Sequence, residues 1–136
     1  MLLRPGAEAA MPYLRKQSMQ LASKMRFISA QLDAMLAGDR WREPAAHANA
    51  MAARLHEALA GVDGVRFTQR VQANALFAVL PPGVAGELQR EWRFYTWDES
   101  TGEVRWMCSW DTRAEDVDAF AAAVRDAVGR ALTPST

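Results

Sequence analysis

The chain has little of several residue types that mark specialised proteins. It holds one cysteine, Cys108, among 136 residues, which excludes an internal disulfide framework and is compatible with a reducing compartment. No apolar stretch approaches the roughly 20 residues that span a bilayer. The start of the chain is too short and too broken by proline and glycine to resemble a secretory signal. We therefore expect a cytoplasmic protein with no membrane partner.

The chain also lacks an excess of charge. Its 16 Lys and Arg residues balance 16 Asp and Glu residues, so the composition gives no reason to expect nucleic acid as a partner. The two histidines, His47 and His56, stand nine positions apart in an expected helix, which places them on opposite sides. Because they cannot share a metal ion and no cysteine is near them, we expect no metal site.

What the chain has in abundance is apolar residues. Half of its residues are hydrophobic, which excludes intrinsic disorder, and its length suits one domain with its own core. Five tryptophans and seven methionines are a large apolar content for such a chain. We expect part of this apolar surface to need a partner.

Two helices are predicted in the first half of the chain. The first spans residues 11–36, because Pro12 suits a first turn, Gly38 suits an end, and no glycine or proline interrupts the segment between them. Its apolar positions form one stripe, which consists of Leu14, Leu21, Met25, Ile28, Leu32 and Met35. The second helix spans residues 43–60 and turns Ala48, Met51, Leu55 and Leu59 inward.

Short strands are predicted in the second half. They cover residues 65–68, 75–80, 94–97 and 103–112, with a short helix at 84–92. Thr112 and Glu115 have the spacing of a capping box, so a last helix is expected to begin there. The residues of that helix expected to face the sheet are Val117, Phe120, Val124, Val128 and Leu132. Two helices followed by β-β-α-β-β-α predict an α+β fold with a mainly antiparallel sheet.

The segment EVRWMCSWDT, residues 103–112, raises the question of function. With a period of two, Val104, Trp106, Cys108 and Trp110 form a buried face, and Cys108 is a small apolar residue of that face. Arg105 opens the opposite face. It is either ordinary solvent-facing charge or a group directed at a ligand, and residue types alone leave both interpretations open.

A second basic feature lies in the first predicted helix. Lys24 and Arg26 are two residues apart and belong to a basic stretch of that helix. They are either part of a solvated helix face or a site for an anion. The residue pattern does not choose between these two.

Several strings together resemble one enzyme family. They are residues 14–27 (LRKQSMQLASKMRF), 47–52 (HANAMA), 72–77 (QANALF), 104–112 (VRWMCSWDT) and 115–120 (EDVDAF). In this order they resemble the carboxy-terminal part of the low-specificity L-threonine aldolases. These are pyridoxal 5'-phosphate enzymes of the β-eliminating lyase group with the aspartate-aminotransferase-like fold.

The resemblance implies a reaction and roles for three residues. The family cleaves L-threonine and related β-hydroxy-α-amino acids to glycine and an aldehyde. Arg105 matches the arginine that binds the substrate α-carboxylate, for which a planar two-pronged donor is suited. Arg26 matches an arginine near the cofactor phosphate, donated across a subunit boundary, and Lys24 is a weaker companion.

The resemblance also implies what this chain does not hold. The family lysine that carries the cofactor as a Schiff base has no counterpart, so residues 1–40 correspond to the end of a large-domain strand (Met1–Leu3) with a connecting helix, and residues 41–136 to a small carboxy-terminal domain. We expect the chain alone to be inactive, to bind no cofactor and to self-associate, as part of an enzyme that is a dimer or tetramer. Two alternatives are a stand-alone α+β module that binds a small carboxylate and a remnant without function.

Overall fold

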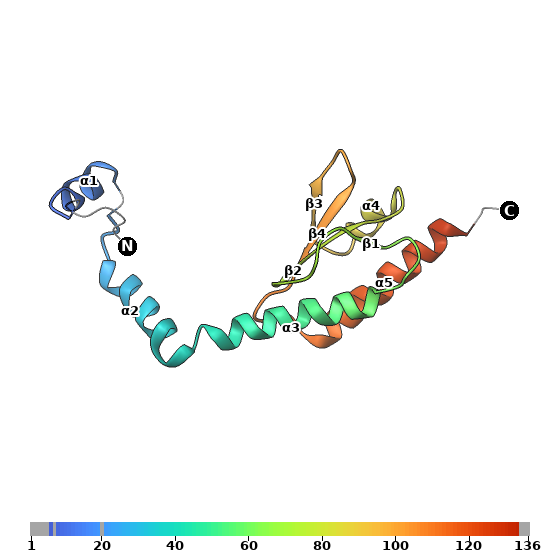
Figure 1. Cartoon of the computed structure of the whole chain (residues 1–136), viewed down its shortest axis with the longest axis horizontal. Helices are drawn as coiled ribbons and strands as arrows, with labels where there is room; N and C mark the ends of the chain where they lie inside the picture. The colour runs from blue at the N-terminus through green and yellow to red at the C-terminus, as the bar shows by residue number, and fades with distance from the viewer. Residues whose placement is uncertain (1–5, 7, 20, 134–136) are drawn as a thin grey trace. The chain divides into compact units, whose positions relative to one another are not determined.

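The computed structural model describes residues 6, 8–19 and 21–133 (Figure 1). The expected strand at residues 1–3 lies outside this part of the chain. The described residues divide into two compact units, with the boundary between Arg40 and Trp41. Each unit is described by itself.

The first unit contains two short helices where one long helix was predicted. They are α1 (Met11–Gln17) and α2 (Met25–Leu36), and the short 3-10 turn η1 (Ala37–Asp39) follows α2. The prediction of one continuous helix is wrong, since the chain leaves helical geometry after Gln17 and Met19 adopts a φ of 53°. Short helices without a packed face are marginal, so the lack of glycine and proline alone does not keep a helix continuous.

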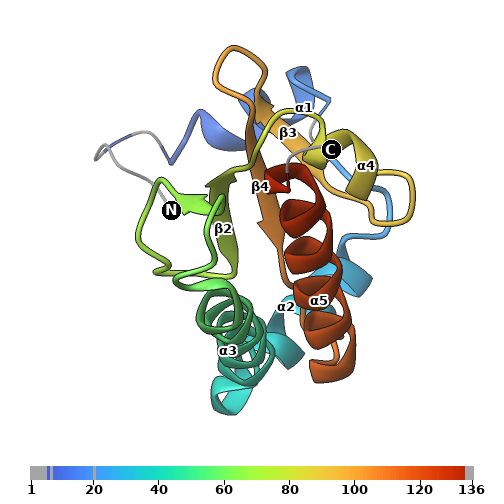
Figure 2. The same cartoon turned by 90° about the vertical axis from the view of Figure 1, so that its right-hand side faces the viewer.

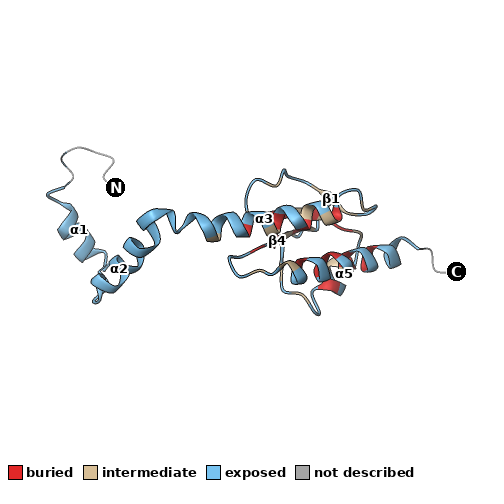
Figure 3. Ribbon diagram, turned by 90° about the horizontal axis from the view of Figure 1, so that it is seen from below, coloured by how far each residue is buried: buried red, intermediate tan, exposed pale blue. Residues whose placement is uncertain are grey.

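The apolar stripe of the first unit is exposed. No residue of α1 or α2 is buried, and both helices are coloured as exposed in Figure 3. The exposed apolar residues of these two helices include Leu14, Met25, Phe27, Ile28, Leu32, Met35 and Leu36. The stripe predicted from the sequence therefore exists on α2, but the described residues of its own unit do not cover it.

The second unit is an α+β domain, as predicted. Its elements are α3 (Arg42–Leu59), β1 (Arg66–Phe67), β2 (Ala75–Val79), α4 (Val84–Leu88), β3 (Tyr95–Asp98), β4 (Glu103–Met107) and α5 (Ala114–Leu132). The strands form one antiparallel sheet in the order β1-β2-β4-β3. Helices α3 and α5 contact each other and cover one face of this sheet (Figures 1 and 2).

The core of this domain lies between the sheet and the two long helices. Ala52 of α3 and Ala121 of α5 are fully buried, and such small side chains let helices approach closely. The covered face of the sheet contributes Leu76, Ala78, Val104 and Trp106, all 3% exposed or less. An aromatic cluster closes one side of the core, and its members are Trp92, Phe94, Trp106 and Phe120. The domain therefore has its own hydrophobic core.

The connection from β4 to α5 corrects two predictions. Strand β4 ends at Met107, and Trp110, expected on the buried face, is 71% exposed. The predicted capping box is also wrong, because α5 begins at Ala114 and its N-cap has no side-chain hydrogen bond. The Thr112 hydroxyl instead accepts a hydrogen bond from the Ser109 N–H at 2.8 Å and closes the turn before the helix.

Smaller differences concern the ends of elements. Leu132, expected to face the sheet, is 52% exposed near the end of α5. Gly64, in the loop after α3, has a φ of 86°, and a Cβ there would lie 2.7 Å from Val128 Cγ1. This close approach explains why a glycine is required where that loop passes α5.

None of the helices in the described part of the chain combines the length and the apolar character that a membrane-spanning helix needs.

Candidate functional site

The face of the sheet opposite the two long helices carries Arg105 at its centre. Arg105 of β4 pairs with Phe77 of β2 on one side and with Tyr95 of β3 on the other. Residues paired across an antiparallel ladder point to the same face, so these three side chains form a row across the sheet. Tyr95 and Met107, both on this face, are 73% and 59% exposed. The arginine predicted to lie opposite the buried face thus stands among exposed apolar side chains.

The ring of Trp97 lies against the Arg105 guanidinium. The Cζ atom of Arg105 lies 4.7 Å from the centre of the Trp97 ring, which is the geometry of a cation–π contact. The Trp97 ring in turn meets Phe77 edge-on, with ring centres 5.4 Å apart. The strand register shifts between Thr96 and Asp98, so Trp97 occupies an irregularity in the pairing of β3 with β4.

The acidic residues nearest to this site have other partners. Glu103, two residues before Arg105 on the same strand face, accepts a hydrogen bond from the Thr68 hydroxyl. Asp98 accepts hydrogen bonds from the Ser100 hydroxyl at 2.6 Å and the Ser100 N–H at 2.8 Å, and these bonds hold the pKa of Asp98 below its usual range. Within the described part of the chain, Arg105 makes no ion pair. Its charge is therefore not neutralised by any of the described side chains.

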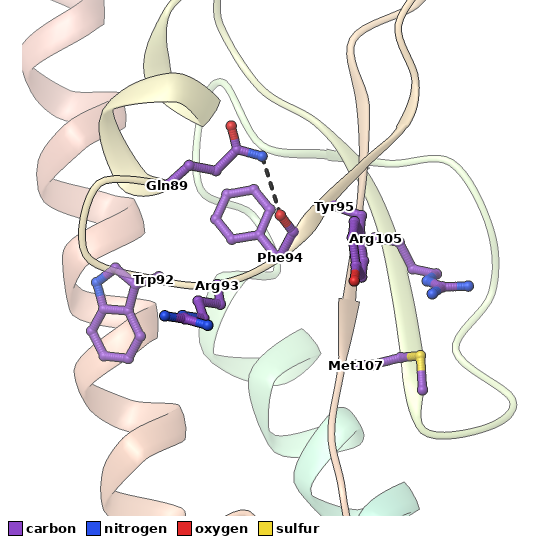
Figure 4. A pocket seen from close by; sticks show the side chains of 7 residues that line it. All are labelled: Gln89, Trp92, Arg93, Phe94, Tyr95, Arg105 and Met107. Carbon is purple, nitrogen blue, oxygen red and sulfur yellow. Dashed lines mark hydrogen bonds between the residues drawn. The ribbon is translucent and has the colours of Figure 1, made fainter.

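An open pocket of about 580 Å³ adjoins the arginine (Figure 4). It is lined by Gln89, Trp92, Arg93, Phe94, Tyr95, Arg105 and Met107. The Gln89 side chain donates a hydrogen bond to the Phe94 carbonyl at 3.2 Å, which ties the end of the α4 segment to the start of β3. Figure 4 shows the guanidinium groups of Arg93 and Arg105 pointing apart, so they do not converge on one anion. A mainly apolar lining with a guanidinium at its margin suits a small carboxylate with an apolar substituent.

The other two predicted binding residues lie in the first unit. Lys24 immediately precedes α2 and Arg26 is its second residue, and both are exposed. The Arg26 Cζ lies 4.9 Å from the centre of the Phe27 ring. Two exposed cations at the start of a 12-residue helix fit the chemistry of a phosphate. Arg105 belongs to the other unit.

Residues with other possible chemistry have structural roles. Burial raises the pKa of the Cys108 thiol, which opposes a reactive thiolate. Its N–H donates to the Asn74 carbonyl at 2.8 Å and keeps the segment after β4 against the sheet. His47 Nε2 lies 2.7 Å from the Thr112 carbonyl oxygen, and the His56 ring lies 4.6 Å from the Phe67 ring. No cluster of potential metal ligands occurs among the residues with described positions.

Trp97 and Phe77 are the site residues that the sequence patterns did not single out. Trp97 was only an apolar member of a predicted strand, and Phe77 was a member of another strand and of the string 72–77. Phe77 faces Arg105 through the register of β2 with β4, and Trp97 reaches it through a pairing irregularity. Neither register nor irregularity has a clear signal in one sequence.

Comparison with known proteins gives one consistent result. The chain is 43% identical over 118 residues to the low-specificity L-threonine aldolase of Pseudomonas aeruginosa, and this match covers 86% of the chain and 34% of that enzyme. A low-specificity L-threonine aldolase from a Pseudomonas species, strain NCIMB 10558, is 42% identical over 114 residues, which are 83% of the chain and 33% of that enzyme. No protein-family model matches the chain.

A threonine aldolase also matches this chain among the solved structures. The threonine aldolase of Leishmania major superposes with a TM-score of 0.78 at 27% identity, over 93% of this chain and 36% of that one. The resemblance to the L-threonine aldolases is thereby confirmed. The chain spans about a third of the length of the relatives that it matches.

Proposed function

We propose that this chain is the carboxy-terminal part of a pyridoxal-phosphate-dependent L-threonine aldolase-like enzyme and that its Arg105 binds the substrate α-carboxylate. The observation that carries the proposal is the position of Arg105. Its guanidinium stands on an apolar face beside an open pocket and makes no ion pair within the described residues. The similarity over 118 residues supplies the reaction class.

The chemistry asks the protein to hold and orient an amino acid. A β-hydroxy-α-amino acid loses its Cα–Cβ bond to give glycine and an aldehyde, and the bound cofactor supplies the electron sink for that cleavage. Arg105 can donate two parallel N–H bonds to the α-carboxylate and so fix the direction of the scissile bond. Lys24 and Arg26 would hold the cofactor phosphate, with Arg26 acting across a subunit boundary.

The proposal assigns no activity to the chain by itself. Neither of its lysines, Lys16 and Lys24, occupies the position of the family's cofactor lysine. Incubation with pyridoxal phosphate and either L-threonine or L-phenylserine should release no aldehyde above buffer. Turnover by the purified chain would overturn this part of the proposal.

The exposed stripe of the first unit supports self-association. Leu32 is 58% exposed and Leu36 is 65% exposed, and apolar surface of this kind favours contact with another subunit. In the whole enzyme this assembly would be a dimer or tetramer in the cytoplasm. Sedimentation velocity over a range of concentrations should show species larger than the monomer. A single monomeric species throughout would contradict the expectation.

A second candidate is favoured by the separate core of the second unit. A domain that folds by itself and exposes Arg105 could bind a small carboxylate without further domains. Calorimetric titration with glycine and with L-threonine separates the two functions. The enzyme fragment should bind either ligand too weakly to saturate at millimolar concentration, whereas a stand-alone module should saturate.

A further inference from the structure

We infer that Trp97 is a positioning residue: its ring holds the Arg105 guanidinium by one face so that the N–H edge remains available to a carboxylate. The inference rests on the proposed function for the role of the carboxylate. The contact itself is independent of that function. The Arg105 Cζ lies 4.7 Å from the Trp97 ring centre.

The planar shape of the guanidinium lets one group bind a ring and a carboxylate together. All five of its N–H donors lie in the plane of the group, so stacking on a ring leaves them free. A salt bridge would instead occupy the same donors that a ligand needs. Trp97 therefore orders a long flexible side chain without competing with the ligand.

The tryptophan is itself held in place. Its ring meets Phe77 edge-on at 5.4 Å, and Phe77 is paired with Arg105 across the β2–β4 ladder. The two rings and the guanidinium thus form one contiguous group on the open face. Because arginine loses considerable rotamer entropy on binding, a side chain ordered in advance binds a carboxylate more tightly.

The nearby acids support the same role for Trp97. Glu103 and Asp98 could compete for a free guanidinium, but Glu103 Oε1 accepts a hydrogen bond from Thr68 and Asp98 Oδ1 accepts one from the Ser100 hydroxyl. The turn that follows β3 begins with the Asp98–Ser100 hydrogen bonds, directly after Trp97. This turn keeps the Asp98 carboxylate bound to the N–H and hydroxyl of Ser100, while the neighbouring Trp97 ring lies against Arg105.

The test observes the Arg105 Nε–H group by NMR in the chain as it exists. In the wild type this resonance should be shifted upfield by the Trp97 ring current and show contacts to the indole protons. W97L should return it to the position of a mobile arginine, whereas W97F should keep part of the shift. W110L is the matched control, because Trp110 is exposed and the described cation–π contact of Arg105 is with Trp97, so the resonance should be unchanged.

Acetate serves as the carboxylate probe in the same samples. The Arg105 resonance should respond at lower acetate concentration than that of Arg93, which is exposed in the same pocket. Loss of one exposed cation–π contact should weaken that response about two- to fivefold in W97L. An unchanged Nε–H resonance and acetate response in W97L would overturn the role of Trp97. A ring-shifted Arg105 that ignores acetate in the wild type would instead contradict the proposed carboxylate site and leave the Trp97 contact established.

Discussion

Adjacent side chains of β4 meet opposite surroundings on the two faces of the sheet. Val104 and Trp106 are 0% and 3% exposed beneath α3 and α5, while Met107 on the other face is 59% exposed. The covered face is apolar and complete, as a domain core requires. The open face holds an arginine without an ion pair in the described chain, among aromatic rings. The first face specifies the fold, and the second is the face on which we propose that a ligand binds.

The largest effect is expected from a charge on the covered face. Val104→Asp would place a carboxylate where no described polar group can pair with it, so the free energy of unfolding should fall by about 4 kcal/mol. Since domains of this kind are stable by only about 5–15 kcal/mol, a loss of this size should lower the melting temperature by roughly 15–30 °C. Circular dichroism during a thermal scan measures this. A melting temperature within a few degrees of the wild type would show that the covered face is not the core.

A smaller effect is expected from the ion pair on the outer side of the helix layer. Arg54 of α3 binds Asp118 of α5 through two hydrogen bonds of 2.8 and 2.7 Å. The Arg54 hydrogen bond and charge lower the pKa of Asp118 below its ordinary value of 3.8. The stability that this pair adds is present above that value and is lost as the pH falls through the lower folded pKa.

Asp118→Asn tests whether this pair matters beside the apolar core. Both side chains are about half exposed, so the change in melting temperature at neutral pH should be small. As the pH falls below about 4, the wild type should lose slightly more stability than the variant. Superimposable pH profiles would mean that solvent screens the pair completely.

The alternating pattern of β4 predicted the two faces only as far as the strand extends. Val104, Trp106 and Cys108 are buried as expected, but Trp110 is not, because the strand ends at Met107 and a turn follows. Alternation in a sequence has no signal for that end when apolar residues continue past it. The break between α1 and α2 escaped prediction for a related reason, since no glycine or proline marks it.

The site was predictable in its central residue and not in its surroundings. Periodicity places Arg105 opposite the core, and the family resemblance suggests a carboxylate for it. The ring that orders it comes from β3, where a shifted register turns Trp97 toward β4. Strand register depends on packing across the whole sheet, which local residue patterns do not determine.

The most direct test of the account replaces the matching third of the Pseudomonas aeruginosa enzyme with this chain and compares it with the same chimera carrying R105K. Lysine keeps the charge but cannot donate two parallel bonds to a carboxylate. We predict that the first chimera cleaves L-threonine and that R105K lowers kcat/KM at least about tenfold, or about 1.4 kcal/mol, with an unchanged melting temperature. Equal kcat/KM values for the two chimeras would contradict the assignment of Arg105 to the substrate carboxylate.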